Sequence, residues 1–138
     1  MGGIDRKRLM ALESKIGHSI PSDLLGVLAE GEPIRRGKVT RVTPGRVWDV
    51  RMTFSLDDGD RNDQLDSLYD LVGDVLPSGA LPFAEDWGGD FYCLMLSGPH
   101  AGRVVYWSHE RDEGDTRIEP VANSVADFFA SLVPDPRE

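Results

Sequence analysis

Three carboxylates, those of Glu85, Asp86 and Asp90, stand on either side of a Gly-Gly pair in the stretch LPFAEDWGGDFYCLML. Paired carboxylates can act as general acid and base when a water-poor pocket raises the pKa of one of them. These three flank two glycines, which favour a flexible turn rather than an enclosed pocket. No cluster of a nucleophile, a base or metal ligands in the sequence is convincing, so we expect no catalytic residues and no enzymatic activity. The enzymatic alternative, a small carboxylate hydrolase, would require a deep pocket around Glu85 and Asp86.

Metal binding is the second kind of chemistry that the residue types allow. An EF-hand register that starts at Asp58 places Asp63 where glycine is required and Tyr69 where the closing glutamate belongs. The three histidines lack the close His and Cys spacings of a zinc site. Cys93 lies in an apolar run, where cysteine is usually a small core residue. The sequence therefore predicts neither a metal site nor a cofactor.

Trp87 suggests another use for the same stretch. An exposed tryptophan among carboxylates is typical of an interface anchor, because the ring supplies buried area and the acidic neighbours select a cationic partner. The alternative is an indole that folds back onto the core, and the sequence leaves both placements open. Gly88 and Gly89 can adopt positive φ and so allow a tight turn at this point.

Charge is unevenly distributed along the chain. There are 24 acidic side chains and 15 basic ones, and the net charge of −9 opposes binding to nucleic acid and to anionic lipid. Residues 35–51 carry six bases and one acid, whereas residues 57–74 carry seven aspartates and one arginine. Such runs are usually solvated faces. Alternatively, the six bases of residues 35–51 could contact the phosphates of a nucleic acid, although the net negative charge of the chain opposes this. The aspartates of residues 57–74 could instead form an acidic surface that binds a basic partner.

The chain has no feature that would send it to a membrane. One cysteine cannot form an internal disulfide, and no stretch reaches the ~18 consecutive apolar residues of a membrane span. Arg6 stands where a myristoylation motif needs Ser or Thr. We expect a cytoplasmic protein with a single domain over residues 1–138, and the oligomeric state stays open.

Hydrophobic spacing predicts four helices. Two short amphipathic helices, over residues 4–16 and 21–31, form an N-terminal helical hairpin. A central helix extends over residues 65–77, and a closing helix begins at Ser124, which forms an approximate capping box with Asp127. The outer face of the central helix carries four carboxylates, those of Asp63, Asp66, Asp70 and Asp74.

Five segments have the composition of strands. In residues 48–54 the even-numbered residues form a buried face and the odd-numbered ones a solvent face, and this strand pairs with residues 38–42 as a hairpin. Residues 90–96 and 103–109 are apolar on both faces, which predicts central strands covered by helices. TRIEPV, residues 116–121, adds a short strand.

Four pieces of the chain, in the same order, resemble the SUKH superfamily, the Smi/Knr-like domain. In LPFAEDWGGDFYCLML a proline and small apolar residues lead to an acidic Gly-Gly-Asp turn and an aromatic-Cys-Leu strand. IGHSIPSDLLGVLAEGE, GRVVYWSHE and VANSVADFFASL are similar to the second-helix entry, the following strand and the Ser-capped closing helix of that family. The resemblance implies an α+β fold in which one mixed or antiparallel sheet is flanked by the helical hairpin, the central helix and the C-terminal helix.

The resemblance also implies a function. Bacterial members are mostly immunity proteins that bind and neutralise a cognate toxin, frequently a nuclease or deaminase, whereas fungal relatives are adaptors. We therefore expect a non-enzymatic antitoxin, with an adaptor for an unrelated cellular protein as the alternative. Toxins that act on nucleic acid present basic clefts, which an acidic surface complements. The predicted partner-binding residues are Asp63, Asp66, Asp70, Asp74, Glu85, Asp86, Trp87 and Asp90.

Overall fold

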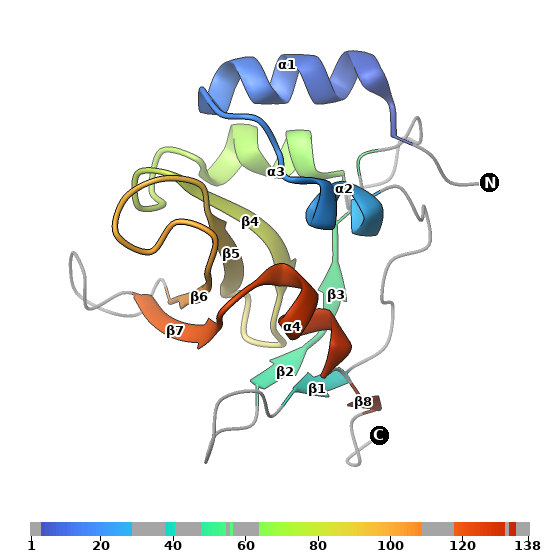
Figure 1. Cartoon of the computed structure of the whole chain (residues 1–138), viewed down its shortest axis with the longest axis vertical. Coiled ribbons are helices and arrows are strands. Elements are labelled where there is room, and N and C mark those ends of the chain that lie inside the picture. The colour runs from blue at the N-terminus through green and yellow to red at the C-terminus, as the bar shows by residue number, and fades with distance from the viewer. Residues whose placement is uncertain are drawn as a thin grey trace.

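A computed structural model describes residues 4–28, 38–40, 48–54, 56, 64–108, 118–131 and 133–134. The helices are α1 (Arg6–Ile16), α2 (Ser22–Leu28), α3 (Leu65–Val72) and α4 (Val125–Ala130) (Figure 1). The strands are β1 (Lys38–Thr40), β2 (Trp48–Val50), β3 (Met52–Thr53), β4 (Ala80–Glu85), β5 (Phe91–Met95), β6 (Val104–Trp107), β7 (Ile118–Ala122) and β8 (Val133–Pro134). The expected α+β fold is confirmed.

The strands of the described ranges form two antiparallel sheets. One has the order β3-β4-β5-β6-β7, and the smaller one has the order β2-β1-β8. In the larger sheet β5 and β6 lie inside the strand order, and every residue of β5 is buried. The prediction that the two apolar runs form central strands is therefore confirmed.

β4 is a strand that sequence patterning misses. It contains Pro82, which cannot donate to a ladder and normally argues against an inner strand. The register with β5 shifts between Pro82 and Ala84, so a bulge accommodates the proline while β4 still pairs with β3 and β5. This strand matters for the site because it leads directly into the Gly-Gly turn.

Residues 48–54 turn a corner at Arg51 instead of continuing as one strand. β2 pairs with β1 in the smaller sheet, as the predicted hairpin requires, whereas β3 pairs with β4 in the larger one. Thr53, expected on the solvent face, is buried. That expectation was wrong because the chain changes sheets at Arg51, so the alternation of β2 does not carry over into β3.

The helices begin and end largely where local signals place them. Asp5 caps α1 by accepting hydrogen bonds from two amides of its first turn, and Gly17 ends the helix with φ of 76°. α3 ends at Val72, earlier than predicted, and Gly73, a weak helix former, follows it. Gly31, the predicted end of the second helix, lies outside the described residues. None of the described helices is long and apolar enough to cross a bilayer.

α4 closes the chain over an aromatic core. Ser124 Oγ accepts a hydrogen bond from the Asp127 amide at 3.0 Å, which confirms the predicted cap. The buried Phe128 ring lies 5.4 Å from that of Phe83 and 5.2 Å from that of Tyr92, so α4 packs against strands β4 and β5 through its apolar side. α4 lies against α2, and α1 lies against α3 on another side of the molecule (Figure 1).

Substitution of two glycines by alanine tests the backbone conformation assigned to α2 and to the Gly-Gly turn. A Cβ built at Gly26, in α2, or at Gly89, in the Gly-Gly turn, meets no atom within 4 Å, but Gly89 has φ of +88°. We expect Gly26→Ala to raise the free energy of unfolding by about 0.5–1 kcal/mol, because alanine is the better helix former. Gly89→Ala should lower it by about 1–2 kcal/mol, because a Cβ disfavours positive φ. Urea denaturation of both variants checks this, and the same sign for both would contradict the assigned turn.

Candidate functional site

Residues 86–90 connect β4 to β5 in a closed turn. The Asp86 amide donates to the Asp90 carbonyl at 2.9 Å, and the Gly89 amide donates to the Asp86 carbonyl at 3.3 Å. Of the two glycines that can adopt positive φ, Gly89 does so and Gly88 does not. The turn places Trp87 at its corner.

The side chain of Asp86 holds this turn from the inside. Its Oδ1 accepts hydrogen bonds from the amides of Gly88 and Asp90, both at 2.9 Å. Its Oδ2 accepts a hydrogen bond from the Tyr106 hydroxyl at 2.5 Å. Only 7% of Asp86 is exposed. The carboxylate expected at the rim of the sheet is therefore also a structural part of the turn.

Asp90 is drawn into the same cluster. Its Oδ2 lies 3.0 Å from the Tyr106 hydroxyl and 3.3 Å from Ser108 Oγ, and the residue is 6% exposed. Burial, and then the neighbouring carboxylates of Asp86 and Asp90, raise the pKa of Tyr106 far above its ordinary value. The phenol is therefore a hydrogen-bond donor and not a base at physiological pH.

Trp87 is the large exposed side chain of the turn. The residue is 55% exposed, so of the two placements that the sequence left open, the indole takes the solvent-facing one. The guanidinium carbon of Arg51 lies 5.8 Å from the centre of its ring, and Arg51 Nη1 donates to Glu85 Oε2 at 2.6 Å. Arg51, at the junction of the two sheets, thus contacts both the Glu85 carboxylate and the Trp87 indole.

The acidic residues of α3 are partly compensated within the chain. Arg8 of α1 approaches Asp66, with 3.7 Å between Nε and Oδ2, and Lys15 forms an ion pair with Asp70. Asp74 is exposed just beyond the end of α3. Asp63, also predicted for the partner surface, lies outside the described residues. Of the described aspartates on this side, Asp74 is thus the one without an ion pair to α1.

The structure therefore gathers the seven described residues of the predicted set into two places. Four of them belong to the end of β4 and the turn that follows it, namely Glu85, Asp86, Trp87 and Asp90. The described others lie on α3 or just after it. Arg51, Tyr106 and Ser108 join the first group, and sequence reasoning missed all three because they reach the turn only through the pairing of distant strands.

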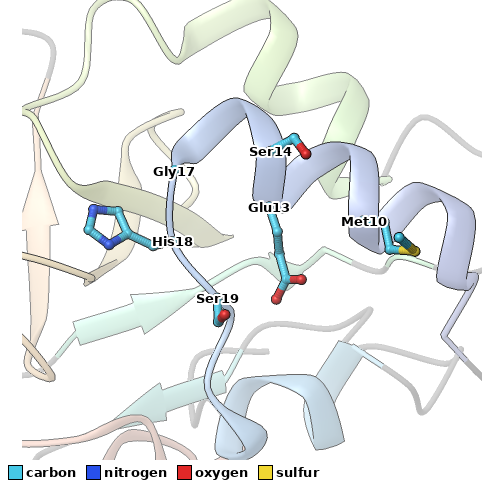
Figure 2. Close-up of a pocket in the computed structure, with 6 residues that line it drawn as sticks. All are labelled: Met10, Glu13, Ser14, Gly17, His18 and Ser19. Carbon is cyan, nitrogen blue, oxygen red and sulfur yellow. The ribbon is translucent and has the colours of Figure 1, made fainter.

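An open depression of about 380 Å³ lies at the C-terminal end of α1. Its lining residues are Met10, Glu13, Ser14, Gly17, His18 and Ser19 (Figure 2). Glu13 Oε2 accepts a hydrogen bond from the Ile20 amide at 2.7 Å, which fastens the connection between α1 and α2. The imidazole of His18 points away from this carboxylate in Figure 2, so the two do not form an acid-base pair.

The cysteine thiol and the potential metal ligands were the other groups considered for chemistry in the sequence. Cys93 is fully buried in β5, which confirms the predicted core position, and burial raises the pKa of its thiol so that it is not a nucleophile. Within the described ranges, no group of three or more His, Cys, Asp or Glu side chains is placed to hold a metal ion.

Comparison with known proteins identifies the family of this chain. No solved structure matches the chain. The SPbeta prophage-derived uncharacterized protein YokK of Bacillus subtilis (strain 168) is 30% identical over 77 residues, which are 56% of this chain and 38% of that protein, so the chain spans well under half of that relative. The model of the SMI1 / KNR4 family (SUKH-1) matches residues 3–131, in agreement with the motifs read along the sequence. This chain therefore belongs to the SMI1 / KNR4 family (SUKH-1).

Proposed function

We propose that this protein is an immunity protein that binds and neutralises a cognate protein toxin in the cytoplasm, without chemistry of its own. Membership of the SUKH-1 family supports a role of this type. The observation that carries the proposed surface is Trp87, a large aromatic side chain that is 55% exposed on a closed turn. The other two tryptophans, Trp48 and Trp107, are buried in the core, so packing accounts for them, but it does not account for the exposed Trp87.

The turn is suited to binding because it is ordered before a partner arrives. Four hydrogen bonds, two from backbone amides to carbonyls and two from amides to Asp86 Oδ1, close it. A preorganised aromatic anchor loses little conformational freedom on binding, which is one reason why tryptophan dominates the energetics of many interfaces. Arg51, beside the indole, belongs to another residue type enriched at such positions.

The charge of the chain favours a basic partner. A net charge of −9 attracts a cationic protein and repels nucleic acid and anionic membranes. Toxins that act on nucleic acid, such as nucleases or deaminases, present basic clefts and fit this requirement. The proposed contact surface has two parts. Trp87 is the anchor of the part at the turn, where Glu85, Asp86 and Asp90 contribute negative charge, and Asp66, Asp70 and Asp74 contribute it on and just after α3, near the undescribed Asp63 in sequence.

Asp74 is the best position at which to test whether negative charge on this surface speeds association with the partner. Reversal at Asp66 or Asp70 would also disrupt contacts with Arg8 or Lys15, whereas Asp74 makes no ion pair within the described residues. We expect Asp74→Lys to slow association with the partner about 2- to 5-fold at low salt and to leave dissociation unchanged. Asp23→Lys on α2 carries the same change of charge elsewhere. Equal slowing by both variants in stopped-flow measurements would reject a directed surface.

Capture of the partner tests the function itself. The tagged protein is used to isolate binding partners from its own host, and each captured protein is then expressed alone and together with this chain. An immunity protein predicts a partner that arrests growth alone and is silent in co-expression. A partner that is harmless alone would instead support an adaptor role, the alternative function implied by the family resemblance.

A further inference from the structure

Tyr106 occupies an unusual position beneath the Trp87 turn. It lies on β6, separated from β4 by β5, and its hydroxyl is 2.5 Å from Asp86 Oδ2 and 3.0 Å from Asp90 Oδ2. One phenol thus faces the two carboxylates that stand at the two ends of the turn. The position of the Tyr106 side chain can therefore influence the conformation of the turn that carries Trp87.

A phenol carries a single hydrogen, so it donates to one carboxylate at a time. The shorter distance makes Asp86 the principal acceptor, and Asp90 also has Ser108 Oγ at 3.3 Å. Without the phenolic hydrogen, Asp86 Oδ2 would lose its donor, and the two nearby carboxylates would repel one another in a poorly solvated place. The expected response is a movement of the Asp86 side chain.

Any movement of Asp86 is transmitted to the turn. The opposite oxygen of its carboxylate accepts from the amides of Gly88, the residue directly after Trp87, and of Asp90, at the end of the turn. A rotation that relieves Oδ2 therefore lengthens or bends the two bonds at Oδ1. The direction of the indole depends on those amides because Gly88 and Gly89 offer little resistance of their own.

The ring of Tyr106 is held independently of its hydroxyl. It lies 5.3 Å from the ring of Trp48, on β2, and 5.3 Å from that of Tyr92, its cross-strand neighbour on β5. These contacts keep the phenol in place from both sheets. The hydroxyl can thus be removed as Tyr106→Phe while the aromatic packing is retained.

We propose that Tyr106 is a positioning residue for the partner surface, and that its hydroxyl orients Asp86 and through it the turn that presents Trp87. This inference rests on the proposed function, because it assigns Tyr106 a part in binding that it performs without touching the partner. It separates the role of the hydroxyl from that of the ring.

Tyr92→Phe is the matched control. The Tyr92 hydroxyl donates at 2.5 Å to the Asp49 carbonyl, so the control also removes one part-buried, hydrogen-bonded hydroxyl from a tyrosine ring of the same sheet. Both variants should lower the thermal midpoint, and Tyr106→Phe by more because its hydroxyl donates to a carboxylate and that of Tyr92 to a neutral carbonyl. A purely structural role of Tyr106 would appear as this loss of stability alone, without a selective change at the turn or in binding.

Amide hydrogen exchange measured by NMR reads the turn directly and needs no partner. We expect Tyr106→Phe to accelerate exchange at Gly88 and Asp90 at least tenfold relative to Tyr92→Phe, with core amides of β5 and β6 alike in the two variants. Equal exchange at Gly88 and Asp90 in the two variants would overturn the proposal. If Tyr106→Phe does not fold, Asp86→Asn replaces it, because an amide cannot accept at both ends, and the same local acceleration is expected.

Dissociation of the captured partner supplies the second measurement. We expect the off-rate to rise about tenfold in Tyr106→Phe and less than twofold in Tyr92→Phe. A Trp87→Ala variant that loses affinity while Tyr106→Phe dissociates like the parent would overturn the positioning role. If Trp87→Ala itself binds like the parent, the proposed contact surface is what fails, so the two failures are distinguishable.

Discussion

Trp87→Ala is expected to weaken binding of the cognate partner about 100-fold, equivalent to about 3 kcal/mol, mainly through faster dissociation. The physical reason is that the indole offers a large apolar area on a turn that is already ordered, so its truncation removes contact without a compensating gain of entropy. Surface plasmon resonance with the captured partner measures the effect. The free energy of unfolding should change by less than about 0.5 kcal/mol because the side chain is more than half exposed.

Leu71→Ala is the matched control for this variant. Leu71 is 82% exposed on α3, so its truncation also removes a large solvent-facing apolar side chain at little cost in stability. Its affinity for the partner should stay within about twofold of the parent, in keeping with the near-neutral contacts that surround most hot spots. Loss of binding in Leu71→Ala with none in Trp87→Ala would move the apolar anchor of the contact from the turn to α3.

Asp86→Ala is expected to have the largest effect on folding, a decrease of about 3–5 kcal/mol in the free energy of unfolding. The substitution removes the acceptor of three hydrogen bonds, from the amides of Gly88 and Asp90 and from the Tyr106 hydroxyl. Each bond to an ionised acceptor contributes about 1.5–3 kcal/mol, and donors left buried without a partner add a further cost. Denaturant unfolding followed by circular dichroism measures the change.

Asp74→Ala provides the comparison for that experiment. Asp74 is exposed and has no ion pair within the described residues, so truncation there should change the free energy of unfolding by no more than about 0.5 kcal/mol. Equal stability of the two variants would show that the Asp86 carboxylate does not hold the turn. The Tyr106 hydroxyl would then not orient Trp87 through Asp86.

Binding and folding are thus assigned to different residues of one short segment. Trp87 faces solvent and contributes to contact, whereas Asp86, directly before it in the chain, is buried and contributes to the shape of the turn. A similar division applies at α3, where Asp66 and Asp70 approach bases of α1 while the exposed Asp74, just beyond the helix, makes no ion pair within the described residues. Acidic residues that look equivalent in the sequence therefore have different availability to a partner.

Local sequence was sufficient for the features that depend on neighbours along the chain. The αL glycine after α1, the Ser124 cap of α4 and the glycine turn before β5 are all found where they were predicted, because each is a property of a few consecutive residues. The two apolar runs became inner strands because a segment that is apolar on both faces must be covered on both.

Tertiary structure decided what each of these elements meets. The corner at Arg51, the bulge that admits Pro82 and the strand β8 on β1 follow from which strands pair, and pairing joins residues far apart in the chain. The register of β5 with β6 sets Tyr106 beside Tyr92, and the fold brings its hydroxyl to Asp86 and Asp90. Side-chain type and spacing can show that a carboxylate exists, but only the packing of distant segments determines whether it binds a neighbour or faces water.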